Sequence, residues 1–332
     1  LRPPTWVALR KRSHMNHCFI INPAAGSGKA QSGLEQEIRR VCGEMGEDCT
    51  VYYTEREGDC ERYVRRRCAM GDDVRIYACG GDGTLCDVVN GAAGFPNVEV
   101  GIIPIGTGTD FVRNFSPRER FMDMAAQLRG VTHPIDLIKY NGRYLINMLN
   151  TGFDCEVVRQ VAHIKNNPLV PGKLAYIIGV IKVLIKKPGV RMRVSVDGGE
   201  PCERELLLTC VGNGGFCGGG FRSEPYASPS DGVMDVSFVK NVTRRKFISM
   251  LSSYKNGSYL ARRDASEIAD FVRCSRLDIE FPAPQAVSID GEIEDCVRLE
   301  LSVERGAMRF CVPEGCTQLE PLPMTTAETA TV

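Results

Sequence analysis

Three glycine-rich turns, each directly after a short apolar segment, constrain this chain more than any other feature. The first reads Asn-Pro-Ala-Ala-Gly-Ser-Gly-Lys over residues 22–29, the second Cys-Gly-Gly-Asp-Gly-Thr over 79–84, and the third Gly-Thr-Gly-Thr-Asp-Phe over 106–111. In an open parallel sheet, the turns that follow the strands meet at one edge, and ligands bind there. We therefore expect a parallel α/β sheet whose carboxyl edge carries a single crevice.

The spacing of apolar residues supports such a sheet from residue 15 to about residue 140. Short apolar segments alternate with amphipathic ones, which is typical of parallel α/β folds. We expect strands at 17–22, 50–53, 73–79, 98–103 and 134–139, and helices at 30–45, 59–70, 85–92 and 118–128.

The pattern changes after Asn141, where strand-like segments follow one another with few helices between them. We expect strands at 144–150, 190–197, 205–211, 234–240 and 276–281, and helices at 172–186 and 244–259. This pattern predicts a second, mostly antiparallel β-sandwich domain. The α/β domain is expected over 15–140, completed by about 305–320, and the β-rich domain over 141–304. Residues 1–14 and 321–332 are predicted to be flexible tails, with Met15 as the true start.

Composition excludes several classes of protein. Lys+Arg and Asp+Glu number 41 each, so no net field draws the chain to nucleic acid, and we expect no nucleic-acid partner. The fifteen cysteines are scattered without zinc-ligand spacing, which favours reduced thiols and a cytoplasmic location. The longest apolar run, residues 174–185, is too short to cross a bilayer.

The chemistry of the first turn is ambiguous by itself. Pro23 occupies the first glycine position of a Walker A loop and Ala30 its hydroxyl position, while the turn also lacks the third glycine of the dinucleotide fingerprint. Taken alone, a plain strand-to-helix turn explains it equally well. The other two turns change this balance. Their glycines let phosphate approach the backbone, and Asp82 and Asp110 supply the oxygen ligands that Mg²⁺ prefers. Together the turns predict a nucleotide site.

Six motifs, in order along the chain, carry a family resemblance. They are Asn-Pro-Ala-Ala-Gly at 22–26, Gly-Gly-Asp-Gly-Thr at 80–84, Pro-Ile-Gly-Thr-Gly-Thr-Asp-Phe at 104–111, Asp-Leu at 136–137, the stretch 225–235, and Asp-Gly-Glu at 290–292. From about His17 to Pro313 the chain resembles the diacylglycerol kinase catalytic domain, in the group of bacterial soluble diacylglycerol kinases and sphingosine-kinase-like enzymes. The resemblance implies a two-domain, NAD-kinase-like fold and an ATP-dependent lipid kinase. The second motif is also similar to NAD kinase, but the later motifs favour lipid kinases.

The resemblance also implies roles for individual residues. Those that would touch ATP are Asn22, Gly26, Ser27, Thr54, Gly80, Gly81, Asp82, Gly83, Thr84 and Thr107. The catalytic Mg²⁺ would be held or positioned by Asp82, Asp110 and Asp136. Glu292 matches the family's general base, which takes the proton from the lipid hydroxyl. Without the resemblance, an exposed acid beside a hairpin turn is the simpler interpretation of Glu292, because Asp-Gly is a strong turn signal.

A second, structural Mg²⁺ is implied at the stretch 225–235. Asp231 would be its side-chain ligand, with the backbone oxygens of Ser228 and Val233, although a simple Asp-Gly turn explains the same residues almost equally well. The chain departs from the family pattern at Thr109, Cys86 and Asp87, where Asn, Asn and Glu are usual. These departures favour, as an alternative, a catalytically silent nucleotide- or lipid-binding regulator.

A lipid kinase needs an apolar route to its substrate. Residues 172–187 are apolar with four lysines and predict either a segment on the bilayer surface or a core helix, and the glycine run 212–220 predicts a loop facing the cleft. We expect the partner to be a lipid at the inner face of the membrane, with diacylglycerol as the leading substrate. A sphingoid base, ceramide or polyprenol stays open as substrate, as does a homodimer.

Overall fold

Four parallel strands build the N-terminal part in the order β2-β1-β3-β4. They are β1 (Asn16–Ile21), β2 (Cys49–Tyr53), β3 (Val74–Gly80) and β4 (Val98–Pro104). The computed structural model describes residues 15–28, 33–106, 108–153, 155–157 and 189–324. Ile21 pairs with Cys79, and Cys79 pairs with Ile103, so β1, β3 and β4 end level with one another. The three glycine turns therefore leave the sheet at one edge.

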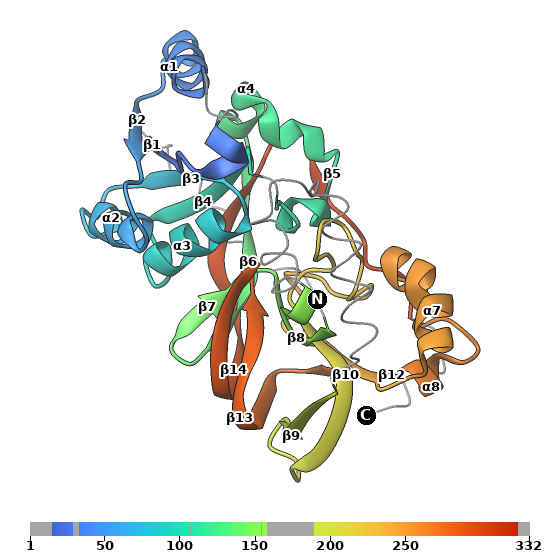
Figure 1. Cartoon of the computed structure of the whole chain (residues 1–332). Coiled ribbons are helices and arrows are strands. Elements are labelled where there is room, and N and C mark those ends of the chain that lie inside the picture. Colours follow the sequence, from blue (N-terminus) through green and yellow to red (C-terminus); the bar gives the residue numbers. More distant parts are fainter. Residues whose placement is uncertain (1–14, 29–32, 107, 154, 158–188, 325–332) are drawn as a thin grey trace, which may run out of the picture.

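Helices cover both faces of this sheet (Figure 1). On one face lie α1 (Leu34–Met45) and α4 (Met124–Leu128), and on the other lie α2 (Asp59–Cys68) and α3 (Asp82–Ala92). Side chains of β1 alternate between the two layers: Phe19 packs on the α1 side, whereas Cys18 and Ile20 pack on the α3 side. The predicted parallel α/β layer is confirmed.

The second part is mostly antiparallel, as predicted. Its strands are β6 (Val131–Tyr140), β7 (Arg143–Leu145), β8 (Met148–Gly152), β9 (Val190–Val196), β10 (Cys202–Gly212), β11 (Met234–Lys240), β12 (Ala269–Cys274), β13 (Arg276–Ile289) and β14 (Glu292–Val312). The long strand β14 joins the two parts, because it pairs antiparallel with β13 and β6 and, at Phe310, parallel with β4. The exact domain limits stay a prediction.

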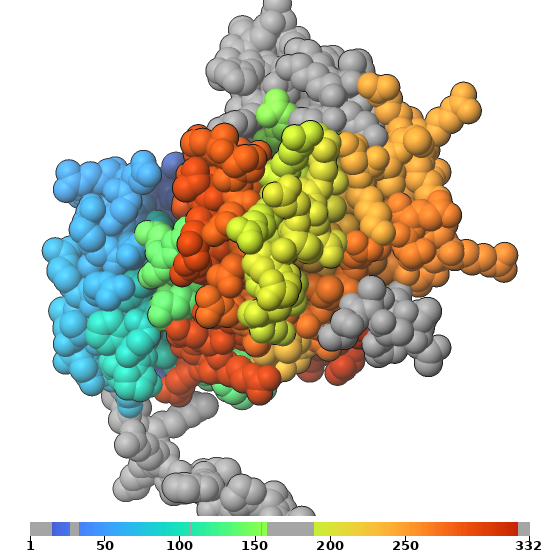
Figure 2. All heavy atoms as spheres, turned by 90° about the horizontal axis from the view of Figure 1, so that it is seen from below, coloured from blue at the N-terminus to red at the C-terminus, as the bar shows by residue number. Residues whose placement is uncertain are grey.

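Two apolar clusters fill the second part. One lies among β8 to β11, β13 and β14, and includes Val194, Val236 and Leu299. The other lies beneath α7 (Arg244–Asn256) and includes Leu208 and Met250. Figure 2 shows β9–β10 and β13–β14 side by side, between the N-terminal helices and the α7 segment. The described part of the fold is thus an α/β layer joined to a β-sandwich-like layer, against which α7 packs.

Short elements complete the chain. They are η1 (Ala25–Gly28), η2 (Phe111–Asn114), β5 (Phe115–Ser116), η3 (Arg118–Met122), α8 (Ala265–Ile268) and β15 (Thr317–Gln318). All fifteen cysteines lie in the described part of the chain, where none of them forms a disulfide, and twelve are buried, as expected for small apolar side chains. Within the described part of the chain, no helix combines the length and the apolarity needed to cross a membrane.

Several predicted elements have different limits in the structure; for example, the strand predicted at 276–281 continues to Ile289. The helix predicted at 118–128 is interrupted at Asp123, whose extended backbone starts α4 and whose carboxylate accepts a hydrogen bond from the Ala126 N–H (3.0 Å). The strand predicted at 144–150 is two strands, β7 and β8, because the N–H groups of Ile146, Asn147 and Met148 donate to the carboxylate of Asp290. Helix α1 starts only after Gly33, whose φ of 82° is not helical. The helix predicted at 172–186 lies outside the described residues.

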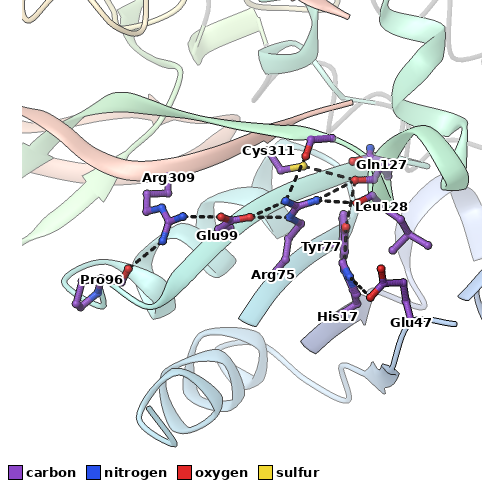
Figure 3. Close-up of polar contacts among 11 residues, drawn as sticks. His17, Glu47, Arg75, Tyr77, Pro96, Glu99, Gln127, Leu128, Arg309 and Cys311 are labelled. Atoms are coloured by element: carbon purple, nitrogen blue, oxygen red, sulfur yellow. Dashed lines mark hydrogen bonds and ion pairs between the residues drawn. The ribbon is translucent and has the colours of Figure 1, made fainter. Parts of the chain in front are cut away.

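A buried ion-pair network holds β14 against the first sheet (Figure 3). Arg75 on β3 donates to Glu99 on β4 (Nε to Oε2, 2.8 Å) and to the carbonyl oxygens of residues 127, 128 and 130. The second carboxylate oxygen of Glu99 accepts from Arg309 on β14 (2.6 Å). Because Arg75 and Glu99 are buried, each depends on the other for its charge compensation.

Candidate active site

The three glycine turns are bound directly to one another. The Gly106 N–H donates to the Gly80 carbonyl (3.0 Å), and the Asp82 N–H donates to the Gly108 carbonyl (2.9 Å). A Cβ atom at Gly81 would lie 2.7 Å from the Gly108 oxygen, and one at Gly106 would lie 2.6 Å from the Gly81 nitrogen. Only glycine allows this close approach, which leaves a floor of backbone groups.

The first turn joins this floor through Asn22. Its side-chain amide donates to the Thr84 hydroxyl (3.1 Å), and its N–H donates to the Cys79 carbonyl (3.1 Å). Thr84 lies inside the first turn of α3, which begins at Asp82 with Gly81 as its N-cap. Backbone N–H groups at the start of this helix are free of intrahelical partners and favour anionic ligands.

Two aspartates, Asp82 and Asp110, line the cavity beside these glycine turns. The Asp82 carboxylate accepts from the N–H groups of Asp110 (2.8 Å) and Phe111 (3.2 Å). Burial raises the pKa of Asp82 to about 7, and the charges of Asp110 and Asp290 act in the same direction. Asp110 accepts from Arg113 (2.8 Å) and from the Gly219 N–H (2.8 Å), so it ties the third turn to the glycine run of the second part.

A hairpin from the second part delivers Glu292 to the same place. Asp290 and Gly291 form the two-residue turn between β13 and β14, with φ values of 47° and 94°. The buried Asp290 carboxylate accepts three N–H groups, from Ile146, Asn147 and Met148 (2.9–3.0 Å), and this separates β7 from β8. Glu292 follows as the first residue of β14, and its Oε1 atom lies 2.9 Å from the point where a Cβ would stand on Gly83. Glu292 therefore lies over the first turn of α3.

Asp87 lies one helical turn after Gly83. Burial raises the pKa of Asp87 to about 6, and the Glu292 charge adds to this shift. Within the described residues, the carboxylates of Asp87 and Glu292 make no hydrogen bond or ion pair, although both side chains line the same cavity. The site therefore concentrates negative charge that the described side chains do not neutralise.

All of these groups line one cavity of about 950 Å³ with two different ends. The polar end contains Asn22, Gly26, Gly81, Asp82, Gly83, Thr84, Asp110 and Glu292. The apolar end contains Phe153, Leu208, Phe221, Phe247, Met250 and Tyr254. Asn150 also lines the cavity, and it is a buried residue whose Oδ1 atom has no hydrogen-bond partner in the described structure. A polar end for phosphates thus opens into an apolar end for hydrocarbon.

Comparison with known proteins decides the family. The diacylglycerol kinase catalytic domain family matches residues 16–140, and the YegS C-terminal NAD kinase beta sandwich-like domain matches residues 147–312. A protein named "Probable lipid kinase YegS-like" from Alcanivorax borkumensis is 31% identical over 280 residues, which cover 83% of this chain and 90% of that protein. The chain belongs to the diacylglycerol kinase catalytic-domain family. It is a lipid kinase of this group, as the six motifs predicted.

Other relatives agree with this assignment. "Diacylglycerol kinase" from Bacillus subtilis is 28% identical over 277 residues, covering 82% of this chain and 88% of the relative. The crystal structure of a diacylglycerol kinase from Bacillus anthracis has the same fold, with a TM-score of 0.66, 21% identity, and coverage of 90% and 97% of the two chains. The predicted two-domain fold of these kinases is confirmed.

The predicted nucleotide residues divide into three groups. Those listed above at the polar end line the cavity of the kinase. Gly80, the last residue of β3, and Thr54, which follows β2, do not line the cavity. The Thr54 N–H donates to the Ile21 carbonyl (3.0 Å). Thr107 lies outside the described residues, and Ser27 lies in η1, with its side chain also outside the description.

Asp136 is not brought to this cavity. Its carboxylate accepts from the N–H groups of Gly232 (2.6 Å) and Gly306 (2.7 Å), and it lines a separate pocket of about 330 Å³. The geometry therefore does not support its predicted place beside Asp82 and Asp110. Asp136 instead fastens the loop at 228–233 to β14, which buried hydrogen-bonded carboxylates commonly do.

The side-chain ligand predicted for a second metal, Asp231, lines this smaller pocket. The Asp231 carboxylate pairs with Arg273 and accepts from the Val233 N–H (3.3 Å), while the Ser228 carbonyl accepts from the Asp231 N–H (3.4 Å). Asp231 thus already faces a cation, and these residues do not fit a metal unless Arg273 moves. In the main cavity, Asp110 likewise pairs with Arg113, but the carboxylates of Asp82, Asp87 and Glu292 have no ion-pair partner among the described residues and fit a divalent cation. No three His, Cys, Asp or Glu side chains among the described residues could ligate it together, which leaves room for the phosphates and waters that Mg²⁺ retains.

Of the three positions that depart from the family pattern, Cys86 and Thr109 lie outside the cavity lining, and Asp87 lines the cavity. Cys86 is buried and approaches Asn90 Nδ2 (3.5 Å) and the Tyr144 carbonyl (3.8 Å), so it packs α3 against β7 and does not line the cavity. Thr109 does not line the cavity either. The sequence does not predict a site role for three residues of this region. Asp290 belongs to a motif but is explained there as a turn residue, Asp87 stands out only as a departure from the family pattern, and Asn150 ends a strand of mostly apolar residues.

Proposed function

We propose that this kinase transfers the γ-phosphate of ATP to the hydroxyl of a membrane lipid, with diacylglycerol as the leading substrate and phosphatidic acid as the product. The observation that carries the proposal is the single cavity, which is lined both by backbone N–H groups and carboxylates, Glu292 among them, and by aromatic and aliphatic side chains. A water-soluble acceptor would not need the apolar half.

At the polar end, the glycine turns and the start of α3 would hold the ATP phosphates with their backbone N–H groups. Asp82 and Asp110 would hold Mg²⁺, directly or through waters, and the ion when bound would neutralise charge on the phosphates. Glu292 would accept the proton of the lipid hydroxyl as its oxygen attacks the γ-phosphate. Its position over the first turn of α3, in the lining of the same cavity, supports this role.

At the apolar end, aromatic and aliphatic side chains would receive an acyl chain. Asn150 lies opposite Ser288 in the pairing of β8 with β13, and both line the cavity. The partnerless amide oxygen of Asn150 supports a polar group of the lipid at this point. We also propose a cytoplasmic kinase that meets its substrate at the inner face of the membrane, and no nucleic-acid partner.

The test is a parallel assay of acceptors. Purified kinase is incubated with γ-labelled ATP, Mg²⁺ and mixed vesicles that contain diacylglycerol, sphingosine, ceramide or a polyprenol, or with NAD⁺ without lipid. Labelled phosphatidic acid, lost in Asp82→Ala, is expected. Label in another lipid would keep the phosphotransfer and change the substrate, and labelled NADP⁺ would overturn the lipid assignment. ATP binding without any transfer would favour the silent regulator.

A further inference from the structure

Helix α7 presents two different faces. Phe247, Met250 and Tyr254 are buried at helical spacing in the cluster beneath it. On the outer side of the helix, Ile248 is 62% exposed, and Leu251, which lies between the buried and the outer side, is 39% exposed. α7 lies at the edge of the molecule farthest from α1 to α3 (Figures 1 and 2). Single exposed apolar residues are ordinary, so this face needs further support before it indicates a partner.

Charge around the helix supplies that support. Residues 243–267 contain six Lys and Arg side chains but only two acids, a net charge of +4, whereas the whole chain is neutral. Both acids are engaged, because Asp264 pairs with Lys246 and Arg262, and Glu267 pairs with Lys246. Exposed cations that remain on or beside the outer face include Arg245 and Lys255. The patch is therefore apolar at its centre and positively charged around it.

The cavity provides an independent link. Phe247, Met250, Leu251 and Tyr254 of α7 line its apolar end, and Leu251 is also exposed on the outer face. The same helix thus separates the hydrocarbon-compatible part of the cavity from solvent. A surface that met α7 from outside would lie next to the route into the apolar end.

We propose that the outer face of α7 docks on an anionic lipid bilayer. Ile248 and Leu251 enter the interfacial region, the surrounding cations contact lipid phosphates, and a lipid passes beside Leu251 into the cavity. A second copy of the chain is the poorer occupant, since two such faces of charge +4 would oppose each other in a symmetric dimer. Basic side chains near a membrane surface each attract anionic lipid, whereas a short apolar contact alone binds weakly. The proposal deepens the proposed function and rests on it for the entry of a lipid substrate.

The experiment measures binding of the full chain to vesicles of phosphatidylcholine, alone or mixed with phosphatidylglycerol, by flotation. Wild type is compared with Ile248→Glu and with the double variant Arg245→Glu/Lys255→Glu. The matched controls are Val297→Glu on β14, where Val297 is 55% exposed, and Arg191→Glu/Arg193→Glu on β9. We expect wild type and controls to bind the mixed vesicles and each α7 variant to bind at least roughly tenfold more weakly.

Phosphorylation of a short-chain, water-soluble diacylglycerol separates the two proposals, because it needs no vesicle. The α7 variants should retain that activity while losing activity on mixed vesicles. If they bind vesicles as wild type does, or if light scattering shows a dimer that Ile248→Glu dissociates, the docking proposal is overturned. If wild type docks through α7 but phosphorylates no lipid, the docking holds and the proposed function fails.

Discussion

Gly83→Ala should disable the kinase without unfolding it, because the added methyl group meets the side chain of Glu292. A Cβ at Gly83 would lie 2.9 Å from Oε1 of Glu292, and ordinary contact begins near 3.4 Å, so the carboxylate must retreat by about 0.5 Å. Since a displacement of about 1 Å can cost about 100-fold in rate, half of it should lower kcat roughly tenfold. The Michaelis constant for ATP should change much less, and stability should not fall, because alanine favours a helix over glycine.

The matched control is Gly43→Ala in the interior of α1. No atom lies within 4 Å of a Cβ built there, so this change should stabilise the protein by about 0.5–1 kcal/mol and leave kcat unaltered. Steady-state kinetics and urea unfolding measure both effects. In a Glu292→Asp background the shorter side chain clears the methyl group, and Gly83→Ala should then cost little. An equal loss of kcat in both backgrounds would refute the argument, because the methyl group would then act on something other than Glu292.

Three further changes probe the rest of the account. Burial raises the pKa of Asp82 to about 7, so the stability that its protonated form provides is present below about pH 4 and is lost as the pH rises through 7. The free energy of unfolding of Asp82→Asn, measured in urea without nucleotide, should therefore rise relative to that of wild type by up to about 4 kcal/mol between pH 4 and 8. Asn150→Ala should raise the Michaelis constant for the lipid roughly 3- to 10-fold, because it removes the proposed polar contact with the lipid. Stability should be unchanged, because the Asn150 Oδ1 atom has no hydrogen-bond partner in the described structure that the substitution would leave unsatisfied. Arg75→Met should cost about 3–5 kcal/mol in thermal or urea unfolding, because Glu99 then keeps only the partly exposed Arg309 as a partner and three carbonyl groups lose their donor. Arg40→Met on the surface of α1 should cost less than about 1 kcal/mol.

The sequence predicted the parallel layer well because its signals are local. Short apolar segments that alternate with amphipathic ones mark β1 to β4, and glycine turns follow three of these strands, so the shared edge could be inferred before any contact was known. The limits that failed depend on single polar groups. Asp123 interrupts a helix by capping the next one, and Asp290 interrupts a strand from 142 residues away by binding the Met148 N–H. Sequence spacing cannot reveal a hydrogen bond between such distant segments.

The site was predictable only in its polar half. Asp82, Asp110 and Glu292 belong to recognisable motifs, and the cavity contains all three. Asp136 also belongs to a motif, yet its two backbone partners hold it in a different pocket. The apolar half is assembled from β10 and α7, whose residues look like ordinary core in the sequence, and it adjoins the glycine run 212–220, which was predicted to face the cleft and of which Cys217, Gly218 and Gly219 line the cavity. Only the folded chain shows that they surround an open space.

Glu292→Gln tests the central claim most directly, because it removes the proposed base while keeping nearly the same shape. ATP binding by calorimetry and the single-turnover rate of lipid phosphorylation should be measured on the same preparation. The account predicts unchanged ATP affinity and a rate reduced at least about 100-fold. A wild-type rate would show that Glu292 does not accept the proton, and a parallel loss of ATP affinity would place Glu292 in the nucleotide site and not at the lipid hydroxyl.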